Sequence, residues 1–364
     1  MSRRLDETLD RAVVAPRSLA CEDLEFLLSL ADPEARRELR QCAYGLKCRF
    51  RGKLVSMRGI IEMGNVCAKD CYYCGIRKSN ASLARYQLSV ADVVRMAERN
   101  AAQGYASVVL QSGEIESEAH TQYIEECLRG IRPLGLGVTL SLGEQSEETY
   151  RRWREAGAER YLLRIETSNP DLYAAIHPSD HSWTRRVECL RALRRCDYQV
   201  GTGVMCGLPG QTAADLARDV AFFGEMDVDM VGMGPYLTHP DTPLAASSPQ
   251  ETDVERLERG LDLIAVTRLY LHDVNIAATT ALQALAHDGR ERGILAGANV
   301  MMPNVTDTEY RRRYQLYAGK PCLDENATLC RGCLERRLAA IGETVNYGQR
   351  GDSPHYLKRK GTQA

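Results

Sequence analysis

The 364-residue sequence has little net charge, no long apolar run near its start and no linker-like segment. Its formal net charge is −2, so composition gives no electrostatic reason to expect nucleic acid or an anionic membrane as a partner. The opening stretch MSRRLDETLDRAVV scatters charges along its length, which argues against a signal peptide or a membrane span there. No Gly-Ser linker, low-complexity run or sequence repeat interrupts the chain, which favours one main domain.

Cysteine, in contrast, is plentiful. The chain carries 13 cysteines without a recognisable secretion signal. Disulfides are rare in reducing compartments, so we expect these thiols to stay reduced and to be available for metal. The expected location is the cytoplasm.

Three of the cysteines, Cys67, Cys71 and Cys74, form a CxxxCxxC motif. Three thiolates at this spacing can hold one corner of a cubane [4Fe-4S] cluster, leaving the fourth iron open to a ligand that is not protein. A structural zinc site would need four ligands, and no fourth Cys or His lies nearby in the sequence. The alternative is that these thiols are incidental or bind zinc with a distant partner, which their spacing disfavours.

From residue 55 the sequence alternates short β-branched apolar runs with amphipathic helical stretches, a pattern typical of βα units and a parallel sheet. Eight strands are expected, at 55–63, 106–114, 137–144, 160–167, 199–207, 230–237, 274–282 and 298–304. Helices are expected between them at 89–103, 120–131, 147–156, 183–195, 212–225, 253–269 and, least clearly, 284–295. Eight parallel strands favour an α/β fold of the closed (β/α)8 TIM type over an open doubly wound sheet.

This pattern divides the chain into three parts. Residues 1–50 carry helical periodicity and are expected to form an N-terminal helical cap. Residues 51–305 are expected to form the barrel. Residues 306–364 are expected to form a C-terminal extension that closes the barrel and carries a second cysteine group.

Polar residues gather where the expected strands end, which is where the active site of such a barrel lies. They are Glu62, Ser112, Gly113, Glu114, Thr139, Ser141, Glu144, Arg164, Glu166, Thr279 and Thr280. Charges inside a barrel are costly unless they are paired or bind a ligand. For Arg164 and Glu166 a structural ion pair is the alternative, but their alternating positions place both side chains on one face and favour ligand contact.

A second group of cysteines lies near the C-terminus. Cys322, Cys330 and Cys333 follow a C-x7-C-x2-C pattern, which could hold a second cluster, either [2Fe-2S] or [4Fe-4S]. Such a cluster would leave at least one iron site to an outside ligand. Three cysteines that bind no metal, or that bind zinc, remain the alternative.

The motif CxxxCx(aromatic)C, with Tyr73 before the last cysteine, resembles the cluster motif of the radical S-adenosylmethionine (SAM) superfamily. Over residues 50–340 the chain further resembles the FeFe-hydrogenase maturase family HydE. The segments that carry this resemblance are IIEMGNVCAKDCYYCGIR, VVLQSGE, VTLSLGE, AERYLLRIETSNP, GLPGQT, GMGPYLTHPDTPLA, AATTAL, GANVMMPN and YQLYAGK. The resemblance implies a radical SAM barrel, and the optional second cluster of some members matches the C-terminal cysteines.

The resemblance also implies roles for single residues. Cys67, Cys71 and Cys74 would hold the [4Fe-4S] cluster, with Tyr73 near the adenine of SAM. Residues implied at the SAM are Glu166, Arg186, Tyr314, Ser112, Gly113 and Glu114, and the strand ending in GLPGQT would contact adenine. Residues implied to line the interior beside it, where a substrate binds, are Arg164, Thr139, Ser141, Thr279 and Thr280. Without this family resemblance, Arg186 would be interpreted as a charged residue on the solvent-exposed face of a helix.

The chemistry implied by the family follows from the open iron. SAM bound there would accept one electron and break into methionine and a 5′-deoxyadenosyl radical. The implied substrate is a cysteine-ligated iron carbonyl cyanide species, or another organometallic or thiol-containing small molecule, on the route to the dithiomethylamine bridge of the hydrogenase H-cluster. Implied partners are HydG-like and HydF-like maturases and a one-electron reductant such as ferredoxin or flavodoxin.

Two other kinds of function fit parts of the pattern. Methylornithine synthase and biotin synthase share the fold and the cluster motif, but biotin synthase needs a second cluster inside its barrel, and among the strand thiols only Cys206 is a candidate for it. A non-catalytic iron-sulfur carrier or scaffold is an alternative of another class. Reductive cleavage of SAM separates the two classes, because a carrier would show none.

Overall fold

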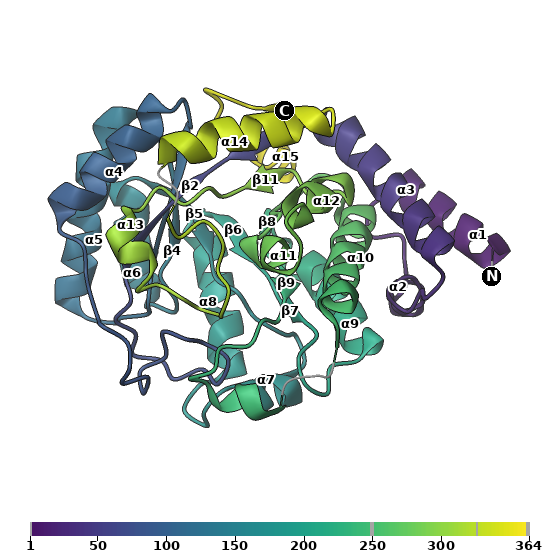
Figure 1. Cartoon of the computed structure of the whole chain (residues 1–364), viewed down its shortest axis with the longest axis horizontal. Coiled ribbons are helices and arrows are strands. Elements are labelled where there is room, and N and C mark those ends of the chain that lie inside the picture. The colour runs from purple at the N-terminus through teal and green to yellow at the C-terminus, as the bar shows by residue number, and fades with distance from the viewer. Residues whose placement is uncertain (1, 248–250, 325–326, 362–364) are drawn as a thin grey trace.

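The computed structural model describes residues 2–247, 251–324 and 327–361, without the side chains of Ser2 and residues 327–330. Its centre is a parallel sheet in the order β10-β8-β6-β5-β4-β3-β2 (Figure 1). These strands are β2 (Gly59–Gly64), β3 (Ser107–Ser112), β4 (Gly137–Ser141), β5 (Ala158–Leu162), β6 (Gln199–Thr202), β8 (Met230–Val231) and β10 (Asn275–Ile276). Two short strands, β7 (Met205–Cys206) and β9 (Gly234–Pro235), continue β6 and β8 and pair with each other.

The sheet closes into a ring through β11 (Val300–Met301). On one side, Val300 forms a parallel bridge with Ala277, just after β10. On the other side, the Ile60 N–H donates to Pro303 O at 2.8 Å, and Ile60 bridges Asn304. β1 (Leu54–Met57) pairs with β11 and with β12 (Thr344–Val345). The predicted barrel of eight parallel strands is therefore confirmed.

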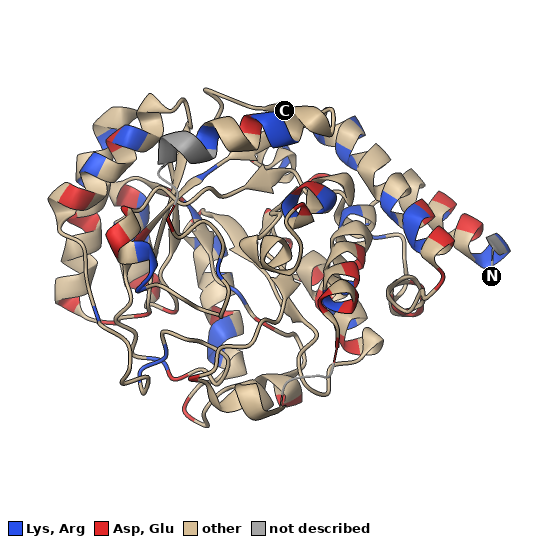
Figure 2. Ribbon diagram, in the orientation of Figure 1, with Lys and Arg blue, Asp and Glu red and all other residues tan. Residues whose placement is uncertain are grey.

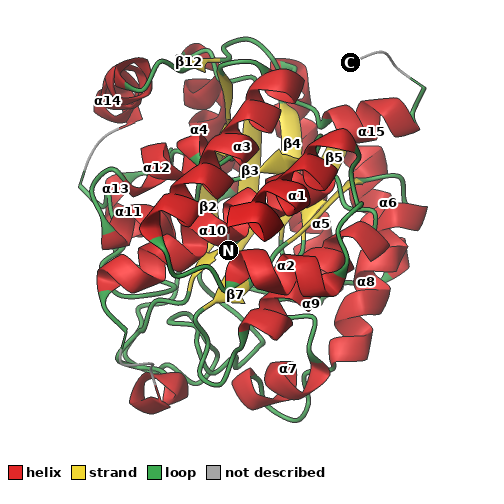
Figure 3. Cartoon of the chain, turned by 90° about the vertical axis from the view of Figure 1, so that its right-hand side faces the viewer, coloured by secondary structure: helices red, strands yellow, loops and turns green. Residues whose placement is uncertain are grey.

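The helices that follow the strands lie outside the barrel (Figure 3). They include α4 (Val90–Ala102), α5 (Glu118–Ile131), α6 (Glu147–Ala156), α7 (Pro170–Ile176), α8 (Trp183–Arg195), α9 (Ala213–Glu225) and α10 (Asp253–Leu271). A Ser or Thr hydroxyl caps the N-terminus of most of them, as at Ser89, Ser117 and Thr212. Lys, Arg, Asp and Glu are interspersed along these outer helices (Figure 2).

The seventh unit differs from the prediction. The run 274–282 was expected to be one strand, but β10 ends at Ile276 and α11 (Thr280–Leu285) begins four residues later. The helix expected at 284–295 is split into α11 and α12 (Gly289–Leu295). Gly289 makes this break possible, because a Cβ there would lie 2.0 Å from Leu282 O.

The first three helices, α1 (Ser2–Val14), α2 (Cys21–Leu28) and α3 (Pro33–Arg51), pack side by side against the outer helices. Leu24 and Leu27 of α2 are fully buried where α2 meets α9, and α3 packs along α10 (Figures 1 and 3). This N-terminal segment therefore widens the hydrophobic core on one flank of the barrel.

The C-terminal tail closes the end of the barrel where the strands begin. Gly351 O accepts hydrogen bonds from Arg58 Nη2 at 3.1 Å and from Asn275 Nδ2 at 2.9 Å. Asp352 Oδ1 accepts one from Gln199 Nε2 at 2.6 Å and pairs with Arg160. Residues of three strands, β5, β6 and β10, and Arg58 between β1 and β2 thus contact the tail, so this end of the barrel is sealed by polar contacts. Two more helices lie beyond the barrel, α14 (Ala327–Ala340) and α15 (Pro354–Arg359). Within the described ranges, no helix is long and apolar enough to cross a membrane.

We predict that α15 stabilises the fold in a pH-dependent way through His355, whose ring lies 3.2 Å from Asp273 Oδ1 and 2.9 Å from Asp227 Oδ1. The hydrogen bond and charge of Asp273, with Asp227, raise the pKa of His355 above its usual value, although burial opposes the rise. A group whose pKa is raised by folding stabilises the fold below its unfolded pKa, and this contribution is lost as the pH rises through the folded value.

Denaturant unfolding of wild type and His355→Gln should therefore differ most below about pH 6.5, the usual pKa of histidine, and converge in mildly alkaline solution. Replacing the exposed His287 by Gln is the control and should show no such trend. A difference that grows with pH would contradict the assignment.

Candidate active site at the barrel mouth

The three clustered cysteines lie on a loop that joins β2 to α4 at the carboxyl ends of the strands. This loop, residues 65–88, has almost no regular secondary structure and is named here the cluster loop. Asn65 ties its two ends together, because its Nδ2 donates to Ala84 O at 3.0 Å and its Oδ1 accepts from Tyr86 N at 2.8 Å. The same Nδ2 donates to Arg313 O at 2.8 Å and so joins the loop to the C-terminal extension.

One guanidinium organises the interior of the cluster loop. Arg85 donates to five backbone carbonyls, those of Asn65, Ile76, Arg77, Lys78 and Asn80, at 2.6 to 3.2 Å. A loop that lacks the regular backbone hydrogen bonds of a helix or a sheet must pair its carbonyls with side chains in this way or expose them to water. Arg85 was not among the predicted site residues, because nothing in its spacing marks a residue that binds backbone.

The thiols fit an iron-sulfur cluster by their chemistry. Burial raises the pKa of Cys71 to about 12, with Cys67 adding to the rise and Arg186 opposing it. Burial and the two neighbouring thiols raise the pKa of Cys74 as well. The three sulfurs therefore lie within electrostatic reach of one another, and their thiolate forms need a nearby positive charge, which iron supplies. In the described part of the chain no three metal-binding side chains converge on one ion, but three cluster ligands bind three different irons.

A network of charges lies beside the cluster loop. Lys69 Nζ lies 3.3 Å from Glu114 Oε1 and 3.1 Å from Glu144 Oε2. Arg186 Nε lies 2.9 Å from Glu144 Oε1, and its Nη2 lies 3.9 Å from Glu114 Oε2. Although burial opposes it, Arg186 and Lys69 lower the pKa of Glu144. The structure thus brings together Glu114, Arg186 and Glu144, which the sequence had indicated, and adds Lys69, which was not predicted at the site.

Arg164 and Glu166 form an ion pair at the end of β5, with 2.9 Å between Nη2 and Oε2. Arg164 Nη2 also donates to Val204 O at 2.9 Å. Glu166 is half-buried, with 13% of its side chain exposed, and has a positive φ of 66°, a strained conformation for a residue other than glycine. The ion pair considered as an alternative therefore exists, and it sits at the barrel mouth.

A segment of the C-terminal extension, residues 311–320, crosses the mouth and is named here the mouth strap. Its Leu316 O accepts from Gly75 N of the cluster loop at 2.9 Å. Lys320 Nζ donates to Tyr314 O at 2.8 Å and pairs with Glu62. The hydroxyls of Tyr317 and Thr280 lie 2.7 Å apart. Also on the strap, the expected site residue Tyr314 is buried.

Tyr73 is oriented by a histidine. Its hydroxyl lies 3.2 Å from His177 Nε2, while His177 Nδ1 lies 2.9 Å from the carbonyl of Tyr173. Burial lowers the pKa of His177 to about 3, so the ring is neutral near neutral pH. Since a carbonyl only accepts, Nδ1 carries the proton, and Nε2 accepts from Tyr73.

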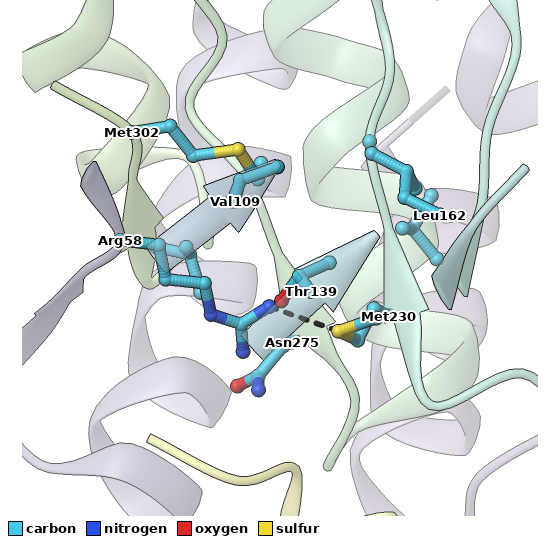
Figure 4. A pocket seen from close by; sticks show the side chains of 11 residues that line it. Arg58, Val109, Thr139, Leu162, Met230, Asn275 and Met302 are labelled. Carbon is cyan, nitrogen blue, oxygen red and sulfur yellow. Dashed lines mark hydrogen bonds between the residues drawn. The ribbon is translucent and has the colours of Figure 1, made fainter. Parts of the chain in front are cut away.

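Below the mouth lies a chamber inside the barrel (Figure 4). Its lining includes Arg58, Val109, Thr139, Leu162, Met230, Asn275 and Met302. Arg58 Nη1 donates to Met230 Sδ at 2.9 Å, and Thr139 Oγ1 has no hydrogen-bond partner within the described residues. Side chains alternate along strands, so Ser141 and Arg164 stand one layer above Thr139 and Leu162. Thr279 lies two residues beyond Ala277 of the lining and donates to Met233 O at 3.1 Å.

The C-terminal cysteines are described only in part. Cys322 O accepts from Arg311 Nη1 at 2.9 Å, and Cys322 Sγ lies 3.8 Å from Gln283 Nε2. Cys333 lies on α14. The side chain of Cys330 lies outside the described residues. The second cluster therefore stays a prediction.

Comparison with known proteins places the chain in a superfamily. Residues 61–223 match the model of the Radical SAM superfamily. The [FeFe] hydrogenase maturase subunit HydE of Thermotoga maritima is 41% identical over 93% of this chain and 94% of that protein. The 3-methylornithine synthase of Methanosarcina acetivorans is 25% identical over 81% of this chain and 83% of its own.

Solved structures support the fold. The crystal structure of methylornithine synthase PylB superposes with a TM-score of 0.80 at 22% identity, covering 94% of this chain and 98% of that one. The FeFe-hydrogenase maturase HydG of Carboxydothermus hydrogenoformans also has a TM-score of 0.80, at 18% identity, covering 95% of this chain and 80% of that one.

The superfamily match and the 41% identity to the Thermotoga maritima protein together define the class: the protein is a radical SAM enzyme, which uses a [4Fe-4S] cluster to cleave SAM. The identity over nearly the whole length goes further, and the chain belongs to the family of the [FeFe] hydrogenase maturase subunit HydE. The resemblance found in the sequence motifs is confirmed.

We predict that Gly113→Ala loses most of its cluster. A Cβ at residue 113 would lie 2.2 Å from Val66 O and 2.8 Å from Cys67 Cβ, so the cluster loop must move. Overpacking of this kind costs about 1–3 kcal/mol where side chains adapt, and more where backbone is in the way. The iron content and visible absorbance of the reconstituted variant measure the loss. Gly45→Ala on α3, with no atom within 4 Å of the new Cβ, is the control, and equal cluster content in both variants would contradict the prediction.

Proposed function

We propose that this enzyme acts on a cysteine-ligated iron carbonyl cyanide precursor during assembly of the FeFe-hydrogenase H-cluster, on the route to its dithiomethylamine bridge. The observation that carries the proposal is the 41% identity to the Thermotoga maritima maturase over 93% of the chain. Methylornithine synthase, at 25% identity, has less support as a guide to the substrate.

The proposed cofactor site uses the residues gathered around the cluster loop. Cys67, Cys71 and Cys74 would hold the cluster, and Tyr73 would lie against the adenine. Residues proposed to contact SAM are Ser112, Gly113, Glu114, Glu166, Arg186 and Tyr314. A cluster held there would supply one electron for the reductive cleavage of the C5′–S bond of SAM, which yields methionine and a 5′-deoxyadenosyl radical.

Charge supports the placement of Arg186. This guanidinium is buried between Glu114 and Glu144, which hold it at a fixed position beside the cysteines. A buried and oriented guanidinium can bind the carboxylate of SAM with two hydrogen bonds. Lys69 adds a second positive charge to the same network, so Glu114 and Glu144 are both balanced.

The proposed substrate site is the chamber and the layer above it. Arg58 and Thr139 bring a guanidinium and an unpaired hydroxyl into an otherwise largely apolar lining, which suits a small anionic complex. Arg164, Ser141, Thr279 and Thr280 would meet the substrate from above. The mouth strap and the C-terminal tail close the two ends, and this closure keeps water and stray hydrogen donors from the radical.

The proposed partners follow from the substrate. A HydG-like maturase would supply the iron species, a HydF-like maturase would receive the product, and ferredoxin or flavodoxin would deliver the electron. A second cluster on Cys322, Cys330 and Cys333 would be accessory. We propose that residues 1–50, 51–305 and 306–364 act as helical cap, catalytic barrel and closing extension.

Assay of 5′-deoxyadenosine tests the proposal directly. We expect reconstituted wild type, given dithionite and SAM, to form 5′-deoxyadenosine, and Cys71→Ala to form none, because the cluster loses one of three ligands. The product of a HydG-like maturase should raise the rate. Cys21→Ala, which removes an exposed thiol far from the loop in sequence, is the control and should behave as wild type.

The outcomes separate the rival functions. If SAM cleavage requires Cys71 but does not respond to the iron species, the radical SAM chemistry would be supported and the proposed substrate would be rejected. No cleavage by wild type would favour an iron-sulfur carrier or scaffold.

The C-terminal cysteines give a separate prediction. Exchanging Cys322, Cys330 and Cys333 together for Ser should lower the iron content while leaving the rate of SAM cleavage close to that of wild type. Iron analysis and the same 5′-deoxyadenosine assay measure both. Unchanged iron content would reject the second cluster, and lost cleavage would show that it is not accessory.

A further inference from the structure

The first two turns of α9 carry two buried acids that reach across to the segment following β5. Asp215 caps α9, since its carboxylate accepts from Thr212 N at 2.8 Å, and its Oδ1 also accepts from Asn169 Nδ2 at 2.9 Å. Asp219, one turn later and fully buried, accepts from Ser168 N at 2.5 Å. Both contacts hold the turn that directly follows Glu166.

That turn matters because Glu166 is strained. A left-handed backbone costs about 1–2 kcal/mol for a residue with a Cβ, so it persists only where its neighbours fix it. Before the turn, Glu166 N donates to Gly203 O at 3.0 Å and its carbonyl accepts from Met205 N at 3.1 Å. After it, the contacts from α9 to Ser168 and Asn169 hold the chain.

The Asp219 carboxylate has few other partners. Its Oδ2 and the Ser168 hydroxyl have no hydrogen-bond partner within the described residues. Burial raises the pKa of Asp219 to about 7, although Ser168 opposes the rise. A buried carboxylate with a single strong donor is costly, and its one strong contact stabilises the turn beside Glu166.

The glycine-rich turn that leads into α9 is ordered by its own Gln211. Gln211 Oε1 accepts from Gly207 N at 2.8 Å, and Gln211 Nε2 donates to Met205 O at 3.0 Å. The Glu166 turn and the turn at residues 205–211 therefore lie at the same end of α9, the first held by Asp215 and Asp219 and the second by Gln211.

We propose that Asp219 is a positioning residue for SAM: by holding the Ser168 N–H it fixes the left-handed turn and so keeps the Glu166 carboxylate directed at the cofactor. This rests on the proposed contact between Glu166 and SAM. Asp219 itself touches neither SAM nor the cluster in this arrangement. Its effect on SAM binding must then pass through Glu166.

A double-mutant cycle tests this coupling. The dissociation constant of SAM is measured for wild type, Asp219→Ala, Glu166→Gln and the double variant, all with loaded cluster, by equilibrium dialysis with labelled SAM. We expect Asp219→Ala to weaken binding roughly tenfold, the size usual when a partner that orients a ligand is lost. In the Glu166→Gln background the same change should weaken SAM binding little further, because the Glu166 carboxylate through which Asp219 acts has already been removed.

Matched variants exclude a general loss of structure. Asp219→Asn keeps an oxygen acceptor for Ser168 N–H and should restore most of the affinity. Asp171→Ala removes an exposed acid in the first turn of the neighbouring α7 and should change nothing. If Asp219→Ala does not fold, Asp219→Ser, whose hydroxyl is one bond too short to reach Ser168 N, takes its place in the cycle.

Two results would overturn the proposal. Additive effects of the two substitutions would make Asp219 a structural residue without a path through Glu166. A Glu166→Gln variant that binds SAM as wild type does would remove the contact on which the inference rests, while SAM cleavage that depends on Cys71 would still stand.

Discussion

The rest of the site depends on the hydrogen bonds that Arg85 donates to five backbone carbonyls of the cluster loop. A cluster with one open iron needs three thiols on a short segment and empty space where a fourth ligand would stand. Such a segment cannot be a helix or a strand, so its backbone groups need partners from side chains. Arg85 makes these five contacts with the Nη1 and Nη2 atoms of one fixed plane, which a lysine could not do.

The buried charges around this loop form ion pairs with one another. Lys69, Glu114, Glu144 and Arg186 balance one another beside the cysteines, and Lys320 pairs with Glu62 under the strap. Paired charges in a dry cavity are rigid, so they hold orientation at the moment of reaction without reorganising. Below them, Arg58 Nε and Thr139 Oγ1 have no hydrogen-bond partner in the part of the chain that the structure describes.

The sequence predicted those features that repeat locally. Alternating apolar runs predicted the eight strands, and cysteine spacing predicted the cluster. The prediction of one strand over 274–282 was wrong, because a short apolar run does not distinguish a strand from a buried helix such as α11. Lys320 and Tyr317 were missed because Glu62 lies 258 residues from Lys320, and no local pattern reports such a contact. Arg186 came from family resemblance alone, since a charge on a helix usually faces water.

The central claim is that the cluster held by Cys67, Cys71 and Cys74 keeps one iron open for SAM. Electron paramagnetic resonance of the reduced, reconstituted protein tests it most directly, with SAM carrying a nitrogen-15 label in its amino group. We predict that SAM shifts the cluster signal and that the label couples to it, because the amino group binds the open iron. A cluster signal that ignores SAM would mean that the protein itself closes the fourth position, and would contradict this account.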